Sequence, residues 1–238
     1  MATRANPMFS VGALVVPFGA LAGVLLFGTN QQLTFVHVMA GVLWTGIDLF
    51  MALVLGPVLG GLAVEERASV FQRFTPKMTF LMPALAFTTI FGGITLASRL
   101  GWFETADPWI ALFSTVSMVP ALLAIGWQFD AFRDWRWWAA FALVGGGSAV
   151  YLLLNLGGFA PIDPAVQVAL VIVTLLTFVG FGVLMPGEAR MYLEMTSDDP
   201  DPNVIGAIGL RNAKLSGVQG VLQLGIIVVM VYLRWGGF

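Results

Sequence analysis

Long runs of apolar residues, separated by short polar or turn-forming segments, occupy almost the whole chain. A helix needs about 20 consecutive apolar residues to cross the hydrocarbon core of a bilayer. Windows of that kind lie at approximately residues 9–28, 33–58, 78–98, 108–128, 137–157, 165–186 and 215–235. The pattern predicts an all-α, polytopic membrane helix bundle with about seven transmembrane helices, forming a single transmembrane domain over residues 1–238.

The longest polar stretch covers residues 187–214 and contains the sequence Asp199-Pro200-Asp201-Pro202. We expect a cytoplasmic loop here, between the sixth and seventh helices. An alternative is that helix six continues past Pro186 and helix seven begins near Asn203. The two prolines would then keep the helices apart, because proline cannot donate to an interior helical hydrogen bond. No extramembrane stretch is long enough to form a separate folded domain.

The first apolar run, from Met8 to Phe27, follows a single basic residue, Arg4. Charge followed by an apolar run is typical of a secretory signal peptide. The run lacks a clear small-residue cleavage site and is close to spanning length. We therefore interpret it as a first transmembrane helix that is retained.

The distribution of lysine and arginine predicts the orientation, because cytoplasmic loops are enriched in these residues. With seven crossings, nine of the eleven basic residues fall on the side of the N-terminus: Arg4, Arg67, Arg73, Lys77, Arg133, Arg136, Arg190, Arg211 and Lys214. The other side receives only Arg99 and Arg234. We expect a cytoplasmic N-terminus and a C-terminus outside.

Composition narrows the functional classes. Apolar residues make up 58% of the chain and charged residues 10%, against about 25% charged residues in soluble domains, so the lipid bilayer is the expected partner. The net charge of −2 offers no basic field for nucleic acid. Without cysteine, disulfides and thiolate metal sites are excluded, and the single histidine excludes a three-histidine zinc site within one chain.

The second apolar window carries the candidate chemistry. Helical residues advance by 100° each, so His37, Gly41, Trp44 and Asp48 share one narrow stripe, and Ala40 with Gly41 leaves space beside it. An aspartate at the centre of a membrane helix costs about 2.5–3.5 kcal/mol on insertion scales. Asp48 should therefore face the protein interior or a wet cavity.

Each polar residue of this stripe has two interpretations. Asp48 either forms an interhelical hydrogen bond or relays protons or cations. The imidazole of His37 either bonds a carbonyl group or binds a metal or haem through its free nitrogen. Trp44 either packs in the bundle or lines a cofactor site.

The pattern His37-x6-Trp44-x-Gly46 resembles the first core helix of the CopD-like copper-resistance membrane proteins and of the HemJ-type protoporphyrinogen oxidases. The resemblance continues through Gly56-Pro57-Val58-Leu59, Arg73 to Lys77, Pro83 and Gly92-Gly93. It covers roughly residues 33–100 and is closest to the uncharacterised CopD-like branch.

In HemJ-type proteins the matching histidine is thought to bind haem b, so the resemblance implies His37 as a haem ligand. No second histidine is available, so the sixth ligand would be a methionine, a lysine, a water molecule or His37 of a second copy, or that position would be vacant. For CopD-like proteins the implied role is copper movement across the inner membrane. Met78 and Met82, one turn apart, could supply soft copper ligands. Asn155, at a depth similar to that of His37, either donates to His37 or a ligand, or caps its own helix.

Three functional hypotheses follow. The first is a bacterial inner-membrane protein that binds haem b through His37, with Trp44, Gly41 and Asn155 nearby, for electron transfer or oxidation. The second is a copper or proton transporter or channel in which Asp48 is the relay. The third is a non-catalytic membrane subunit of a larger complex. The sequence leaves open whether the chain is an enzyme and whether it forms a homodimer.

Overall fold

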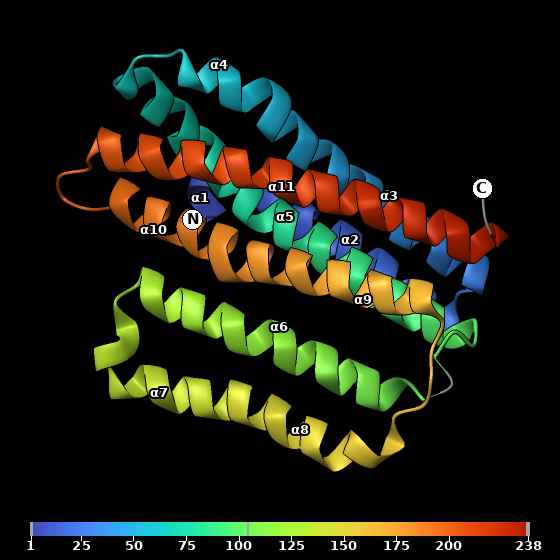
Figure 1. The fold of residues 1–238 in the computed structure, drawn as a ribbon. Helices are drawn as coiled ribbons and strands as arrows, with labels where there is room; N and C mark the ends of the chain where they lie inside the picture. Colours follow the sequence, from blue (N-terminus) through green and yellow to red (C-terminus); the bar gives the residue numbers. More distant parts are fainter. Residues whose placement is uncertain (1, 104, 237–238) are drawn as a thin grey trace. The chain divides into compact units, whose positions relative to one another are not determined.

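A computed structural model describes residues 2–103 and 105–236. These residues form helices and connecting turns without any strand, so the prediction of an all-α fold is confirmed. Seven helices are long and apolar enough to cross a membrane, as the apolar windows predict, and they identify the chain as a multi-pass membrane protein (Figure 1). They cover Pro7–Phe27, Asn30–Gly60, Val64–Arg99, Ala106–Gln128, Trp135–Gly158, Pro164–Met195 and Pro202–Trp235.

Several of these spans consist of consecutive α, π and 3₁₀ segments. The elements are α1 (Ala2–Ala5), α2 (Pro7–Phe27), α3 (Asn30–Phe50), η1 (Met51–Leu55), α4 (Gly56–Gly60), α5 (Val64–Arg99), α6 (Ala106–Gln128), η2 (Ala131–Arg133), α7 (Trp135–Phe141), η3 (Ala142–Gly146), α8 (Gly147–Asn155), η4 (Leu156–Gly158), α9 (Pro164–Thr177), η5 (Phe178–Leu184), α10 (Met185–Met195) and α11 (Pro202–Trp235). The π-helical segments η1, η3 and η5 lie inside spanning helices.

The helix starts have local causes. Thr29 and Gln32 form a capping box at the start of α3, each side chain accepting a backbone hydrogen bond from the other residue. Asp163 accepts from the backbone of Ala165, and Pro164 occupies the first position of α9. These residues satisfy backbone donors that a helix end leaves unpaired.

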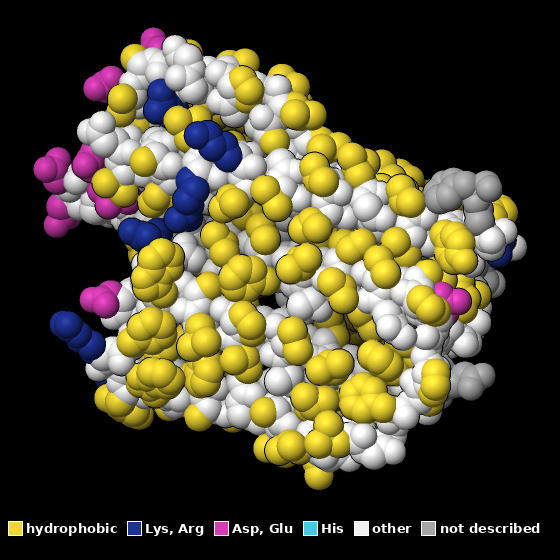
Figure 2. All heavy atoms as spheres, in the orientation of Figure 1, with side chains coloured by type: hydrophobic (Ala, Val, Ile, Leu, Met, Phe, Trp, Pro, Cys, Tyr) yellow, Lys and Arg dark blue, Asp and Glu magenta, His cyan; other side chains and the backbone are white. Residues whose placement is uncertain are grey.

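The surfaces of the helices suit a lipid solvent. Large apolar side chains stand well outside the packed interior, among them Phe27 at 89% exposure and Leu154 at 79%. On the face shown in Figure 2, apolar side chains cover the middle of the helices, and charged side chains gather toward helix ends. Exposed apolar area of this extent is a liability in water and is expected in a bilayer.

The structure differs from the predicted loop at 187–214. Helix α10 continues to Met195 and α11 starts at Pro202, so only residues 196–201 lie outside helices in this stretch. The third spanning helix likewise begins at Val64, well before residue 78. These extensions are stabilised by an apolar core formed by Leu59, Ala68, Phe71, Met191, Met195, Ile205 and Ile208.

The chain divides into two compact units. Unit 1 contains residues 1–99 and 187–220, and unit 2 contains residues 100–186 and 221–238. Helix α10 and the first part of α11 thus pack with the N-terminal helices, although the intervening helices separate them in sequence. The apolar core described above contains residues of both segments of unit 1.

Within unit 1, glycines allow α11 to approach the second span closely. A Cβ atom on Gly217 would lie 2.9 Å from the Cβ of Ala52, and one on Gly56 would lie 3.3 Å from the Cβ of Ala213. Numbers rise along one helix as they fall along the other, so the two helices run antiparallel. Close backbone contact through small residues is typical of membrane helix packing.

Within unit 2, side chains of α6 bond to neighbouring helices. The hydroxyl of Thr115 donates to the carbonyl oxygen of Ser148 at 2.9 Å. The amide Nε2 of Gln128 donates to the carbonyl oxygen of Gly182 at 2.8 Å, inside the π-helical segment η5. Polar side chains of this kind link helices in lipid, where water cannot supply partners.

Candidate functional site

The predicted stripe of α3 faces α5. Trp44 is 4% exposed and Asp48 is fully buried. A Cβ atom on Gly41 would lie 3.3 Å from the Cγ2 of Thr89, so Gly41 also lies against α5. The indole and the carboxyl group therefore point into the protein interior and away from lipid.

His37 is half-buried and makes a defined hydrogen bond to α5. Its Nδ1 atom lies 2.8 Å from the carbonyl oxygen of Thr89. A carbonyl oxygen can only accept, so Nδ1 carries the hydrogen, and in a neutral imidazole Nε2 keeps a free electron pair. The ring lies against Gly93, where a Cβ atom would be 2.8 Å from the imidazole Cε1. Glycine at this position is what allows the ring to pack on the backbone of α5.

His37 itself offers one ligand atom for a metal, its Nε2. On α5, His37 lies against Thr89, Gly92 and Gly93, and none of these three has a side chain that ligates haem iron. Within residues 2–103 and 105–236, no group of three or more His, Cys, Asp and Glu side chains could hold a metal ion. His37 Nε2 is the ring atom that would be left to bind a haem iron.

Asn155 is not in the same unit as His37, because Asn155 belongs to unit 2 and His37 belongs to unit 1. The amide of Asn155 donates to the carbonyl oxygen of Tyr151 in its own helix at 2.8 Å. This bond within its own helix fits the alternative prediction for Asn155, that the side chain caps its own helix.

Met78 and Met82 lie on α5 and are both half-buried. Because α3 and α5 are antiparallel, with His37 opposite Gly93 and Gly41 opposite Thr89, Met82 is at the level of Asp48. It is eleven residues from Gly93, which corresponds to about 16 Å along the helix. The two methionines therefore lie nearer to the level of Asp48 than to the level of His37.

The structure adds a second acidic residue, Glu188 of α10. The hydroxyl of Thr79 on α5 donates to Glu188 Oε2 at 3.1 Å. One turn away, the hydroxyl of Thr75 points to the sulfur of Met191 at 3.8 Å. The predicted loop at 187–214 had placed Glu188 outside the helices.

A signal for Glu188 was nevertheless present in the sequence. Leu184, Glu188, Met191 and Met195 are spaced by four, three and four residues, which is the spacing of one helix face. A carboxyl group within an otherwise apolar stripe must face the protein interior.

Asp48 and Glu188 are close enough to interact electrostatically. Asp48 is level with Met82, and Glu188 is bonded to Thr79, one turn nearer the end of the bundle that contains the turn 196–201. The two carboxyl groups are therefore about one helical turn apart along the bundle axis. We call Asp48 and Glu188 the acid pair.

Further polar side chains are buried in the same unit. Helix α11 contributes Asn212, Ser216 and Gln219, at 8%, 7% and 2% exposure, spaced along one face of the helix. Because Gly220 packs against Leu49, the Gln219 end of this face is at the level of Asp48. Burying polar groups in lipid is costly. Four helices (α3, α5, α10 and α11) place such groups in the interior of unit 1.

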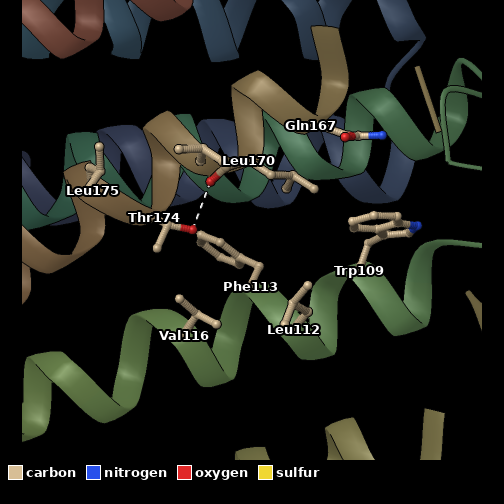
Figure 3. A pocket seen from close by; sticks show the side chains of 9 residues that line it. Trp109, Leu112, Phe113, Val116, Gln167, Leu170, Thr174 and Leu175 are labelled. Atoms are coloured by element: carbon tan, nitrogen blue, oxygen red, sulfur yellow. Dashed lines mark hydrogen bonds between the residues drawn. The ribbon is translucent and has the colours of Figure 1, made fainter. Parts of the chain in front are cut away.

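Unit 2 contains a cavity of about 430 Å³ between α6 and α9, with Trp109 and Gln167 at one end and Leu175 at the other (Figure 3). Its few polar groups are already bonded. The hydroxyl of Thr174 donates to the carbonyl oxygen of Leu170 at 2.8 Å. The side-chain amide of Gln167 donates to the carbonyl oxygen of Ile162 at 3.2 Å. The cavity therefore offers apolar contact without acid–base chemistry.

No family model, curated protein or solved structure matches the chain. The resemblance to the CopD-like and HemJ-type group stays a prediction from the motif around His37.

Proposed function

We propose that the chain is a bacterial inner-membrane transporter or channel that passes protons through unit 1 by way of the acid pair. The observation that carries this proposal is that a fully buried carboxyl group, Asp48, and a half-buried one, Glu188, come from two different helices and lie within electrostatic range of each other. Ionisable residues inside membrane helices are costly, and they commonly mark ion pathways and proton relays.

The chemistry of two adjacent carboxyl groups supports a proton as the transported species. Two negative charges in a low-dielectric interior repel each other, so one bound proton on Asp48 or Glu188 is favoured over two charges. A site that holds one proton between two oxygen-bearing groups can pass it from one to the other. Within residues 2–103 and 105–236, no group of three His, Cys, Asp or Glu side chains could hold a metal cation at this site instead.

The neighbouring side chains suit such a relay. The hydroxyls of Thr79 and Ser216 can both donate and accept a hydrogen bond, as a proton chain requires. The π-helical segment η1 starts three residues after Asp48, and π-helical turns are frequent at functional sites because they alter the regular backbone bonding.

Reconstitution tests the proposal directly. The purified protein is placed in liposomes with an internal pH indicator, and a potassium gradient with valinomycin drives proton entry. Asp48→Asn and Glu188→Gln should each reduce the flux at least about 10-fold, because an amide cannot take up and release a proton under these conditions. Glu65→Gln is the matched control, since Glu65 is exposed at the start of α5.

Helical content and melting temperature of each variant show whether the fold is kept. Parental flux in both acid-pair variants, or a parent protein that leaks no more than empty liposomes, would refute the proposal.

A second candidate function is haem b binding at His37 for electron transfer or oxidation, as the resemblance implies. It is supported by the hydrogen bond from Nδ1 to the Thr89 carbonyl. Histidine ligands of metals usually donate their other ring nitrogen in this way, which orients the ring and leaves Nε2 for the metal. Haem would supply the redox chemistry. His37 would hold its iron through Nε2.

Absorption spectroscopy of protein purified from haem-supplied cells tests this second candidate. We expect a Soret band that is lost in His37→Ala, because no other histidine can replace the ligand. Asn155→Ala should keep the band, since Asn155 bonds within its own helix in the other unit. A colourless, folded parent protein would exclude haem binding at His37.

A further inference from the structure

The cavity in unit 2 lies between two helices that run in the same direction (Figure 3). Trp109 of α6 and Gln167 of α9 are at one end of it, and Leu175 is at the other. Further along, α6 meets η5, which continues α9, and a Cβ atom on Gly182 would lie only 3.0 Å from the Cα of Ala121. The cavity is therefore closed at this inner end by direct contact between the helices.

The length of the cavity matches the depth of one bilayer leaflet. A spanning helix begins at Pro164, so Gln167, three residues later, is near the membrane surface. Leu175 lies eight residues beyond Gln167, which corresponds to about 12 Å along the helix. Half of the hydrocarbon core is about 15 Å thick. The cavity thus runs from the headgroup level almost to the middle of the bilayer.

The cavity is continuous with the lipid-facing surface of unit 2. Val116, Val171 and Leu175 line it, and all three side chains are exposed. The side chains of Thr174 and Gln167 bond to carbonyl groups of their own helix or of the turn before it, so a water molecule would find few partners, and apolar cavities stay dry. Hydrocarbon from the adjoining leaflet is therefore the medium that can fill this space.

The walls of the cavity suit a thin chain and not a second helix. The indole Nε1 of Trp109 donates to the carbonyl oxygen of Ala160 at 3.1 Å, and its ring meets the Phe159 ring edge-on, with 5.1 Å between the centroids. These contacts fix the wall at the outer end. A helix is about 10 Å across with its side chains, and membrane helices approach closely through small residues. Among the described residues that line the cavity, none is a glycine or an alanine.

We propose that the cavity between α6 and α9 binds one acyl chain of a membrane phospholipid, whose ester groups and headgroup lie at the end marked by Trp109 and Gln167. Tryptophan is typical of this level, where apolar chains meet polar headgroups. The basic residues predict that α6 and α9 begin on the outer side, so the lipid belongs to the outer leaflet. The site lies in unit 2, and its test depends on neither proton transport nor haem.

Photolabelling of the full-length protein tests the proposal. The protein is reconstituted in phosphatidylcholine liposomes that contain some phosphatidylcholine with a diazirine in one acyl chain, and labelled residues are mapped by peptide mass spectrometry. We expect the label to concentrate on the side chains within 109–116 and 167–175 that line the cavity. Thr174→Phe and Val171→Phe should each lower this labelling about 10-fold, because the added ring takes the space of the chain. Val168→Phe is the matched control and should keep parental labelling, since Val168 is exposed on α9 and does not line the cavity.

Four results would overturn the proposal. Label spread evenly over the exposed faces of all spanning helices would show that the cavity holds lipid no more firmly than the remaining surface, and parental labelling in both test variants would show that the chain lies elsewhere. Displacement of the label by a long-chain quinone, but not by an equal amount of unlabelled phosphatidylcholine, would assign the cavity to a quinone tail. Crosslinks between two copies in place of lipid label would assign it to a second copy. If Thr174→Phe does not fold, Val171→Phe, at an exposed position, carries the test alone.

Discussion

At the residue scale, the most informative side chain is Thr79. Its hydroxyl oxygen lies 3.1 Å from Glu188 Oε2 and 3.0 Å from the carbonyl oxygen of Thr75. A hydroxyl has one hydrogen, so it can donate to only one of these acceptors at a time. When Glu188 is protonated, its O–H can donate to Thr79, whose hydrogen then turns to Thr75. Thr79 is therefore a donor whose direction follows the charge of Glu188.

Removal of this hydroxyl tests its positioning role in the proposed relay. We expect Thr79→Val to lower proton flux about 10-fold, corresponding to one lost hydrogen bond to a charged group. Thr79→Ser keeps the hydroxyl and should restore most of the flux in the same liposome assay. If Thr79→Ser is as impaired as Thr79→Val, the methyl group and its packing matter, and the hydroxyl does not.

At the element scale, a polar side chain of one helix bonds to the π-helical segment of another. A π-helical turn disrupts the regular i to i−4 bonding and leaves carbonyl groups that need other donors. In η5, the carbonyl oxygen of Gly182 accepts from the side chain of Gln128 on α6. The glutamine thus links α6 to the irregular part of the sixth span, where lipid could not supply a donor.

The replacement Gln128→Leu should therefore destabilise unit 2. We expect a loss of about 1–3 kcal/mol, the usual cost of leaving a buried acceptor unsatisfied. Thermal unfolding in detergent, followed by circular dichroism, measures the effect. Gln167→Leu is the control, because that amide is exposed and bonds only near the start of its own helix. Equal melting temperatures for the two variants would show that η5 does not need the bond.

At the scale of the whole molecule, an odd number of crossings places the turn at 61–63 and the turn at 159–163 on opposite sides of the membrane. These turns follow the second and the fifth spanning helix. The basic residues predict that the first of them is cytoplasmic.

The lack of cysteine in the chain makes this topology easy to test. Ala63→Cys and Pro161→Cys each add one thiol at an exposed turn position. In intact bacterial spheroplasts, a membrane-impermeant maleimide should label Cys at 161 and spare Cys at 63 until the cells are lysed. Labelling of both sites from outside would mean that a span is missing or that the orientation is reversed.

The sequence allowed much of the candidate site to be foreseen, but not its second acid. The spacing of His37, Gly41, Trp44 and Asp48 predicts one helix face, because positions on a single helix depend only on its period. Glu188 was assigned to a loop, since hydropathy alone marks a helix end where polar residues begin. Helix α10 continues there because Met191 and Met195 bury one face against Phe71 and Ile205, contacts that a local window cannot contain.

The sequence by itself determined the spanning helices and the all-α class, because bilayer thickness and backbone bonding act on each apolar segment separately. Only the tertiary structure decided which helices became neighbours. The division into two units, the meeting of Asp48 with Glu188 and the approach of Arg211 to Gly187 all join segments more than twenty residues apart. Lipid tails are as apolar as the helices, so helix pairing is selected by small residues, close packing and polar contacts. Those features act between faces, and no single segment specifies its partner.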